Sequence, residues 1–241
     1  MNFCFHSETK SGFLTIGKKT TPIVNTQVLQ GGLKVTPAFE STFYAAEENN
    51  TLVKTPQPVP GGLLGITAPS WWPKFLRDLF NDTINNGFTG VTATVELVKP
   101  VQFSLINSIL RTGTSTVLPV KVKLSNPFLG NSCYIGSSSQ PITLNLTTGT
   151  TAPPAPNQPI EGSSGDLGGN PQLTIQSLKN TKLVDNSFAV PGANGCGGLF
   201  SFLIDPFVES IVGIPSAAGT NTAVLEGDVL IAKKQAVIES E

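Results

Sequence analysis

The sequence predicts an all-β protein, mainly an antiparallel β-sandwich of about eight to ten strands with two short helices. Charged residues make up only 13% of the 241 residues, whereas 39% are hydrophobic, which is enough to build a core. Turn-forming residues are abundant, with 24 glycines and 19 prolines. Between the turns lie short segments in which apolar and polar residues alternate, the period of a half-buried strand.

The first third of the chain is typical of strands separated by turns. Strands are expected at 13–16, at 21–29 with an end at Gly31-Gly32, and at 33–44, where Pro37 marks an edge or a bend. The stretch that follows, 55–62, has the proline and glycine content of an irregular connector.

Two segments favour a helix over a strand. In the first, Ser70 is a suitable N-cap, and apolar residues follow at i, i+3, i+4 and i+7, so a helix is expected near 70–86. The second helix is expected near 198–212, where the sequence is more apolar and ends before Pro215.

The rest of the chain continues the β pattern within one domain that spans 1–241. A Pro/Gly/Ser-rich excursion at 148–171 is interpreted as a long surface loop, with a domain linker as the alternative. Residues 233–241 are expected to form a frayed tail. The remaining expected strands are 89–98, 117–124, 134–135, 142–147, 173–178, 182–190 and 222–232, with 102–110 either a strand or a short helix.

Cys133 and Cys196 each lie in a glycine-flanked, turn-rich segment. That setting is typical of half of a structural cross-link, so we expect a disulfide between them and an oxidising compartment. If the pair is reduced, both cysteines are inert turn residues. Cys4 is the odd third thiol, and it is free, pairs between chains or competes for one of the other two.

The expected location is extracellular or at the cell surface. The sequence has no stretch of about 18 uninterrupted apolar residues, so no transmembrane helix is expected. The first residues lack the basic start and the apolar core of a signal peptide. The chain is therefore either cytosolic or a mature form that carries an initiator Met, and the cysteine contexts favour the second.

The sequence lacks the signatures of catalysis and metal binding. Its single histidine, His6, lies near a terminus that we expect to be mobile, so a Ser-His-Asp or Cys-His site would depend on one poorly placed residue. No Cys-x-x-Cys or His-x-His pair occurs, and a net charge of −1 gives no electrostatic case for nucleic acid. We expect no catalytic residue, no metal ligand and no cofactor.

The adjacent tryptophans Trp71 and Trp72 support a more specific hypothesis. Neighbouring side chains project about 100° apart on a helix, so at least one indole should face the core. The other would suit a membrane interface or a partner. Trp71, Trp72 and Phe75 are therefore the candidate ligand or partner contacts, and the alternative is that this helix only caps one end of the sandwich.

Four segments carry a resemblance to other proteins. Two contain the cysteines: Asn-Pro-Phe-Leu-Gly-Asn-Ser-Cys-Tyr-Ile-Gly, starting at Asn126, and Phe-Ala-Val-Pro-Gly-Ala-Asn-Gly-Cys-Gly-Gly, starting at Phe188. The other two are Pro-Ile-Thr-Leu-Asn-Leu-Thr-Thr-Gly-Thr-Thr, starting at Pro141, and Gly-Ile-Pro-Ser-Ala-Ala-Gly-Thr-Asn-Thr-Ala, starting at Gly213. Over 90–232 the chain resembles uncharacterised secreted proteins of actinobacteria. The resemblance implies export and pairing of Cys133 with Cys196, and it implies no activity.

These observations favour a non-enzymatic secreted or cell-surface protein that acts through interaction or self-assembly. Its expected partners are a second copy of the chain, an extracellular protein or a glycan, and not nucleic acid. The alternative is an extracellular binding module for a lipid or other apolar ligand, near the Trp71-Trp72 helix. A hydrolase that uses a pair of acids ranks third.

Overall fold

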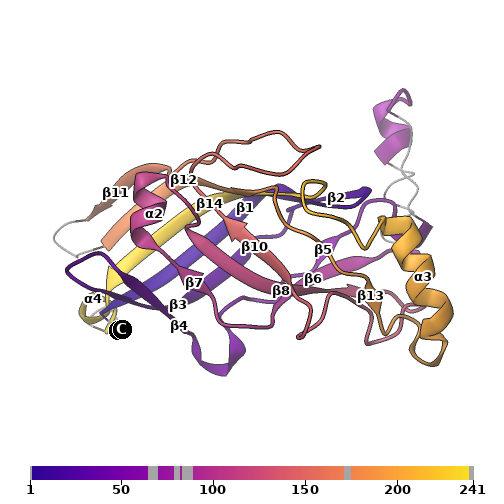
Figure 1. Ribbon diagram of the computed structural model, residues 1–241, viewed down its shortest axis with the longest axis horizontal. Coiled ribbons are helices and arrows are strands. Elements are labelled where there is room, and N and C mark those ends of the chain that lie inside the picture. Colours follow the sequence, from indigo (N-terminus) through magenta and orange to yellow (C-terminus); the bar gives the residue numbers. More distant parts are fainter. Residues whose placement is uncertain (1, 65–69, 79–81, 83–88, 171–174, 239–241) are drawn as a thin grey trace.

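Two antiparallel sheets facing each other form the body of the protein in the computed structural model (Figure 1). The structure describes residues 2–64, 70–78, 82, 89–170 and 175–238. Within this part the chain is mostly antiparallel β-structure with a few short helices, which confirms the predicted class. The sandwich is more divided than expected, because several predicted strands are interrupted by turns.

The first sheet joins both ends of the chain. Its order is β11-β12-β14-β1-β3-β4, with β2 pairing the far end of β1. The strands are β1 (Phe3–Ile16), β2 (Lys19–Pro22), β3 (Gln27–Val35), β4 (Ser41–Ala45), β11 (Asp166–Asn170), β12 (Ile175–Asp185) and β14 (Thr222–Lys233).

The second sheet is centred on one long strand, β8. Its order is β13-β9-β8-β6-β5, and β7 and β10 also pair with β8. The strands are β5 (Gln57–Pro58), β6 (Thr92–Leu97), β7 (Gln102–Phe103), β8 (Thr116–Ser125), β9 (Tyr134–Ile135), β10 (Ile142–Leu146) and β13 (Ala193–Asn194).

Short helices connect and flank the sheets. The expected helix near 198–212 is confirmed as a 3₁₀ turn, η3 (Gly198–Phe200), that leads into α3. In the expected helix near 70–86, residues 74–78 and 82 are helical, and the rest of its second half lies outside the described residues. The other helices are η1 (Glu47–Asn49), η2 (Gly62–Leu64), α2 (Leu105–Leu110), α3 (Ser201–Val212) and α4 (Lys234–Ile238).

The expectation of a mobile N-terminal segment is wrong. β1 starts at Phe3 and lies at the centre of the first sheet, hydrogen-bonded to β3 on one side and β14 on the other. Phe5 is buried, and its ring packs edge-on against Phe43. The polar residues around Lys10 hid this strand in the sequence, because a bulge between Thr9 and Ser11 interrupts the alternation there.

Gly31-Gly32 does not end a strand as expected, but lies inside β3. A Cβ atom on Gly31 would come within 2.6 Å of the Phe43 ring, so the close approach of β4 requires glycine at this position. The expected strand 21–29 is instead divided by a turn between β2 and β3. That turn closes one side of the interior, because its Ile23 lines the space between the sheets.

The excursion at 148–171 packs against the body of the protein. Asn157 Nδ2 donates hydrogen bonds of 2.9 Å to the carbonyl oxygens of Asn186 and Asn221. The excursion ends by entering the first sheet as β11. The described part of the tail also differs from the expectation, since residues 234–238 form α4 rather than a frayed end.

Candidate functional site

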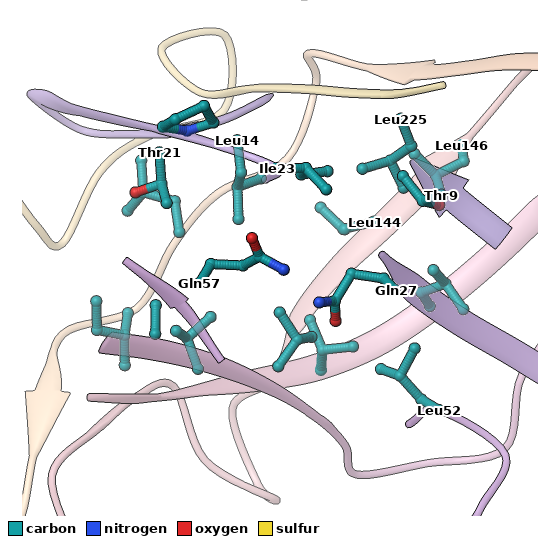
Figure 2. A pocket seen from close by; sticks show the side chains of 18 of the residues that line it. Thr9, Leu14, Thr21, Ile23, Gln27, Leu52, Gln57, Leu144, Leu146 and Leu225 are labelled. Carbon is teal, nitrogen blue, oxygen red and sulfur yellow. The ribbon is translucent and has the colours of Figure 1, made fainter. Parts of the chain in front are cut away.

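The inner faces of the two sheets enclose an apolar cavity of about 160 Å³ (Figure 2). Its walls are mostly aliphatic: Leu14 and Leu225 come from the first sheet, and Leu118, Val120 and Leu144 from the second. No aromatic ring is among the described lining residues. The cavity is therefore lined mainly by branched aliphatic side chains, which favour an apolar occupant.

Strand periodicity explains why the cavity is apolar. Along β8, Val120 and Val122 point inward and are almost fully buried. Lys121 and Lys123 alternate with these valines and lie on the outer face, and Lys121 Nζ stands 3.9 Å from the centre of the Tyr134 ring. The same alternation that builds the sandwich therefore supplies the cavity wall.

A few polar side chains interrupt the aliphatic lining. Ser7 and Thr9 of β1, Gln27 of β3 and Gln57 of β5 are among them. Lys19 is the one charged side chain in the lining that the structure describes, and partial burial lowers the pKa of its amine. Polar groups are costly in such a space unless they have hydrogen-bond partners.

Gln57 uses its amide to hold the turn between β2 and β3. Its Oε1 accepts hydrogen bonds from the backbone N–H groups of Val24 (2.9 Å) and Asn25 (3.0 Å). Its Nε2 donates to the Asn25 carbonyl oxygen at 2.6 Å. Ile23, in the same turn, lines the cavity. Gln57 therefore attaches a side wall of the cavity to the edge of the second sheet.

Only one of the two polar atoms of the Gln27 side-chain amide has hydrogen-bond partners. Its Nε2 donates to the carbonyl oxygens of Thr55 (3.0 Å) and Asn25 (3.4 Å), which fixes the orientation of the amide, because a flipped amide would point its oxygen at two other oxygens. Its Oε1 is buried and has no hydrogen-bond partner. Figure 2 shows the side chains of Gln27 and Gln57 reaching toward each other among the labelled leucines.

A second hollow of about 420 Å³ lies beside β4 and β7. It is larger, but Ser and Thr side chains make up much of its lining. Ser41 Oγ there donates to the Phe103 carbonyl oxygen and accepts from the Leu105 N–H, so this hydroxyl is already used within the fold. We therefore regard the inter-sheet cavity as the candidate site.

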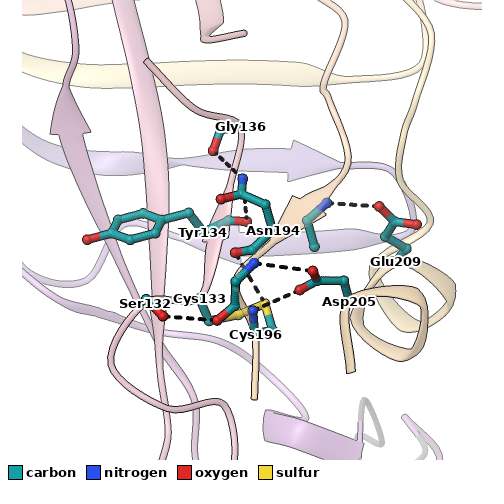
Figure 3. Close-up of a disulfide and its surroundings, with 10 residues drawn as sticks. Ser132, Cys133, Tyr134, Gly136, Asn194, Cys196, Asp205 and Glu209 are labelled. Carbon is teal, nitrogen blue, oxygen red and sulfur yellow. Dashed lines mark hydrogen bonds between the residues drawn. A yellow bond between two sulfur atoms is a disulfide. The ribbon is translucent and has the colours of Figure 1, made fainter. Parts of the chain in front are cut away.

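The predicted disulfide between Cys133 and Cys196 is present, and both cysteines are fully buried (Figure 3). Asp205 of α3 accepts hydrogen bonds from the N–H groups of Gly195 (3.2 Å) and Cys196 (2.8 Å). Glu209, one turn later, accepts from the Ala193 N–H at 3.0 Å. Disulfide and carboxylates together attach α3 to the end of the second sheet.

Trp71, Trp72 and Phe75 lie away from the cavity. The two indole rings contact each other edge to face with centres 6.1 Å apart, and the exposed fractions of Trp71 and Phe75 are 80% and 69%. These residues line neither of the two pockets described above, so the inter-sheet cavity is not the binding site that was expected beside the Trp71-Trp72 helix. Their role as partner contacts stays a prediction.

No carboxylate or histidine is among the described lining residues of either pocket, so the acid pair of the hydrolase hypothesis has no counterpart there. Among the residues that the structure describes, the most buried acid is Asp185, which accepts hydrogen bonds from the backbone N–H groups of Asn145 (2.7 Å) and Ser187 (2.8 Å). Burial raises the pKa of Asp185, and the two hydrogen bonds oppose that rise.

Other ionisable groups form pairs on the surface. Lys10 Nζ lies 2.7 Å from Asp228 and 3.4 Å from Glu8, and the Lys10 hydrogen bond lowers the pKa of Asp228. Within the described residues, no group of three or more His, Cys, Asp or Glu side chains could hold a metal ion. In the same part of the chain, no helix is long and apolar enough to cross a membrane.

Comparisons with known proteins give no relative. No protein-family model, curated protein or solved structure matches this chain. The residues that matter most in the cavity, Gln27 and Gln57, also escaped sequence reasoning. Each is the first residue of its strand, and a glutamine at that position does not indicate that its side chain faces the interior.

Proposed function

We propose that this protein binds a small apolar ligand, or the apolar end of a larger lipid, in the cavity between its two sheets. The observation that carries the proposal is the aliphatic cavity of about 160 Å³. A cavity of about 150 Å³ lined by branched side chains stays free of water and takes up benzene. The space therefore suits an occupant of about that size.

The binding test uses toluene and isothermal titration calorimetry on the full chain. We expect a dissociation constant below about 1 mM, because toluene would bury its apolar surface against mostly aliphatic side chains. Ala93, a small residue of β6 that lines the cavity, provides the blocking variant Ala93→Phe. The control is Ala45→Phe, the same exchange at an exposed position of β4.

Loss of toluene binding in Ala93→Phe and retention in Ala45→Phe would support the proposal. Thermal melts of both variants check that each is folded. Absence of heat with wild-type protein at toluene saturation, or equal binding by folded Ala93→Phe, would overturn it.

A second candidate function is self-assembly through the outer face of η3 and α3. Four side chains there are largely exposed: Leu199 (94%), Phe200 (63%), Phe202 (71%) and Leu203 (59%). Such a patch is unusual on a protein that stays monomeric. The two carboxylates of α3 turn inward to the 193–196 loop, so two copies could meet here without charge repulsion.

Light scattering over a concentration series tests this assembly. We expect dimers of the wild type that Phe202→Ser weakens and that Leu167→Ser, at an exposed position of β11, leaves unchanged. A monomer at every concentration would refute self-assembly. Binding of the monomer to lipid vesicles through Phe202 would replace it with a membrane contact.

An extracellular or cell-surface location fits both candidates. The buried Cys133–Cys196 disulfide supports it, because such bonds persist in oxidising compartments. Mass spectrometry of alkylated protein from its native source, with and without reductant, tests it. Two alkylated cysteines at positions 133 and 196 without reductant would contradict the proposal.

A further inference from the structure

The oxygen of the Gln27 side chain is a hydrogen-bond acceptor without a donor. It is buried at the cavity wall, and its orientation is fixed because Nε2 of the same amide donates to Thr55 and Asn25. Buried acceptors in folded proteins nearly always have a partner, so a donor is expected to reach this atom in the functional state. The walls of the cavity are otherwise mostly aliphatic.

Neighbouring groups define the kind of donor. Thr9 of β1 is the direct cross-strand partner of Gln27 of β3, and both residues line the cavity. Side chains opposite each other on one face of an antiparallel pair lie about 5 Å apart at their Cβ atoms. A hydroxyl group can donate to Gln27 Oε1 and accept from the Thr9 hydroxyl at the same time.

Other donors fit this position less well. An ammonium group would bring an unpaired positive charge into an aliphatic space, which is unfavourable. A carboxylate has only acceptors and would face the Gln27 oxygen without a hydrogen bond. A single water molecule could also donate to Gln27 Oε1 and accept from the Thr9 hydroxyl, but it would leave the aliphatic remainder of the cavity unfilled.

We infer that the cavity selects apolar alcohols, with the ligand hydroxyl donating its hydrogen bond to Gln27 Oε1 and the apolar body filling the space between the sheets. This inference rests on the proposed function. It makes Gln27 the specificity-determining residue of the site. A molecule with the size of phenol, or a larger lipid that ends in a hydroxyl-bearing segment of that size, meets both requirements.

Phenol and toluene are the matched probes, because they differ only in a hydroxyl and a methyl group of similar size. Calorimetry measures both dissociation constants for wild type and for Gln27→Met, which keeps the length of the side chain and removes the acceptor. We expect the preference for phenol over toluene to be about tenfold greater in wild type than in Gln27→Met. Gln30→Met, on the same strand and outside the cavity lining, should keep the wild-type preference.

A measurement on wild-type protein covers the case in which Gln27→Met fails to fold. The side-chain carbonyl ¹³C resonance of Gln27 should shift when phenol is added and stay in place with toluene. Equal phenol preference in wild type and Gln27→Met, or no resonance shift with phenol at saturation, would overturn the inference.

The two proposals fail in different ways. If toluene binds and Ala93→Phe abolishes its binding, the cavity is a ligand site even when Gln27 has no effect on the phenol preference. If neither probe binds wild-type protein, the proposed function itself is wrong.

Discussion

Replacing both Cys133 and Cys196 with alanine tests how the disulfide stabilises this fold. The two cysteines are separated by 63 positions in the sequence. Several contacts beside them do not depend on the sulfurs: Asp205 still accepts the Cys196 backbone N–H, and the Gly197 N–H still donates to the Leu129 carbonyl at 2.7 Å. The native structure should therefore persist, and the main effect should fall on the unfolded chain.

The magnitude follows from the length of the closed loop. Releasing a loop of this length lowers the free energy of unfolding by about 4 kcal/mol in the chain-entropy description. A protein of this size loses about 2–4 °C of Tm for each kcal/mol, so Tm should fall by about 8–16 °C. Guanidinium denaturation should also show a larger m-value, because the unfolded chain without the cross-link exposes more surface.

Cys4→Ala serves as the control. Cys4 is a free, half-buried thiol on β1, so its replacement should change the free energy of unfolding by less than about 1 kcal/mol. A double variant that unfolds within about 1 kcal/mol of the wild type, with an unchanged m-value, would refute the reasoning. The link would then have little effect on the unfolded state.

Three further predictions concern single side chains. Burial raises the pKa of Asp185, so between the ordinary value of 3.8 and the raised pKa the folded state binds more protons than the unfolded state. As pH rises through this window, the free energy of unfolding of wild type should therefore fall relative to that of Asp185→Asn. Denaturation curves at each pH measure this difference, and a difference that stays constant with pH would contradict the prediction. Gln57→Leu removes three hydrogen bonds to the turn between β2 and β3, so it should lower the free energy of unfolding by about 1–2 kcal/mol and speed amide hydrogen exchange at Val24. Exchange as slow as in wild type would show that other contacts hold the turn. Gly31→Ala places a methyl group against Phe43, and urea unfolding should show a loss of about 2 kcal/mol; a neutral substitution would mean that β4 can move away.

Much of the fold could be predicted from local sequence patterns. The alternation in β8 and β10 is strong because each strand has one buried face, and the apolar run that forms α3 ends before Pro215. The glycine turns around Cys133 and Cys196 indicated their pairing. These features depend on a few consecutive residues, so the sequence displays them directly.

The features that the sequence concealed depend on distant segments. β1 is polar near Lys10, and its role as a central strand is decided by β3 and β14 on either side. The cavity exists because the inward side chains of the two sheets do not fill the space between them, and the sequence of a single strand cannot predict that gap. The unpaired oxygen of Gln27 is likewise visible only once the turn at Asn25 and the segment at Thr55 are folded around it.

The pairing of β1 with β14 has a consequence for how the protein is made. Phe3 lies opposite Lys233 and Thr15 opposite Thr222, so β1 must wait for a strand that is synthesised much later. The middle of the first sheet therefore cannot close until β14 has been synthesised. Contacts between such distant segments slow folding, and the nascent chain keeps two unpaired strand edges until β14 arrives.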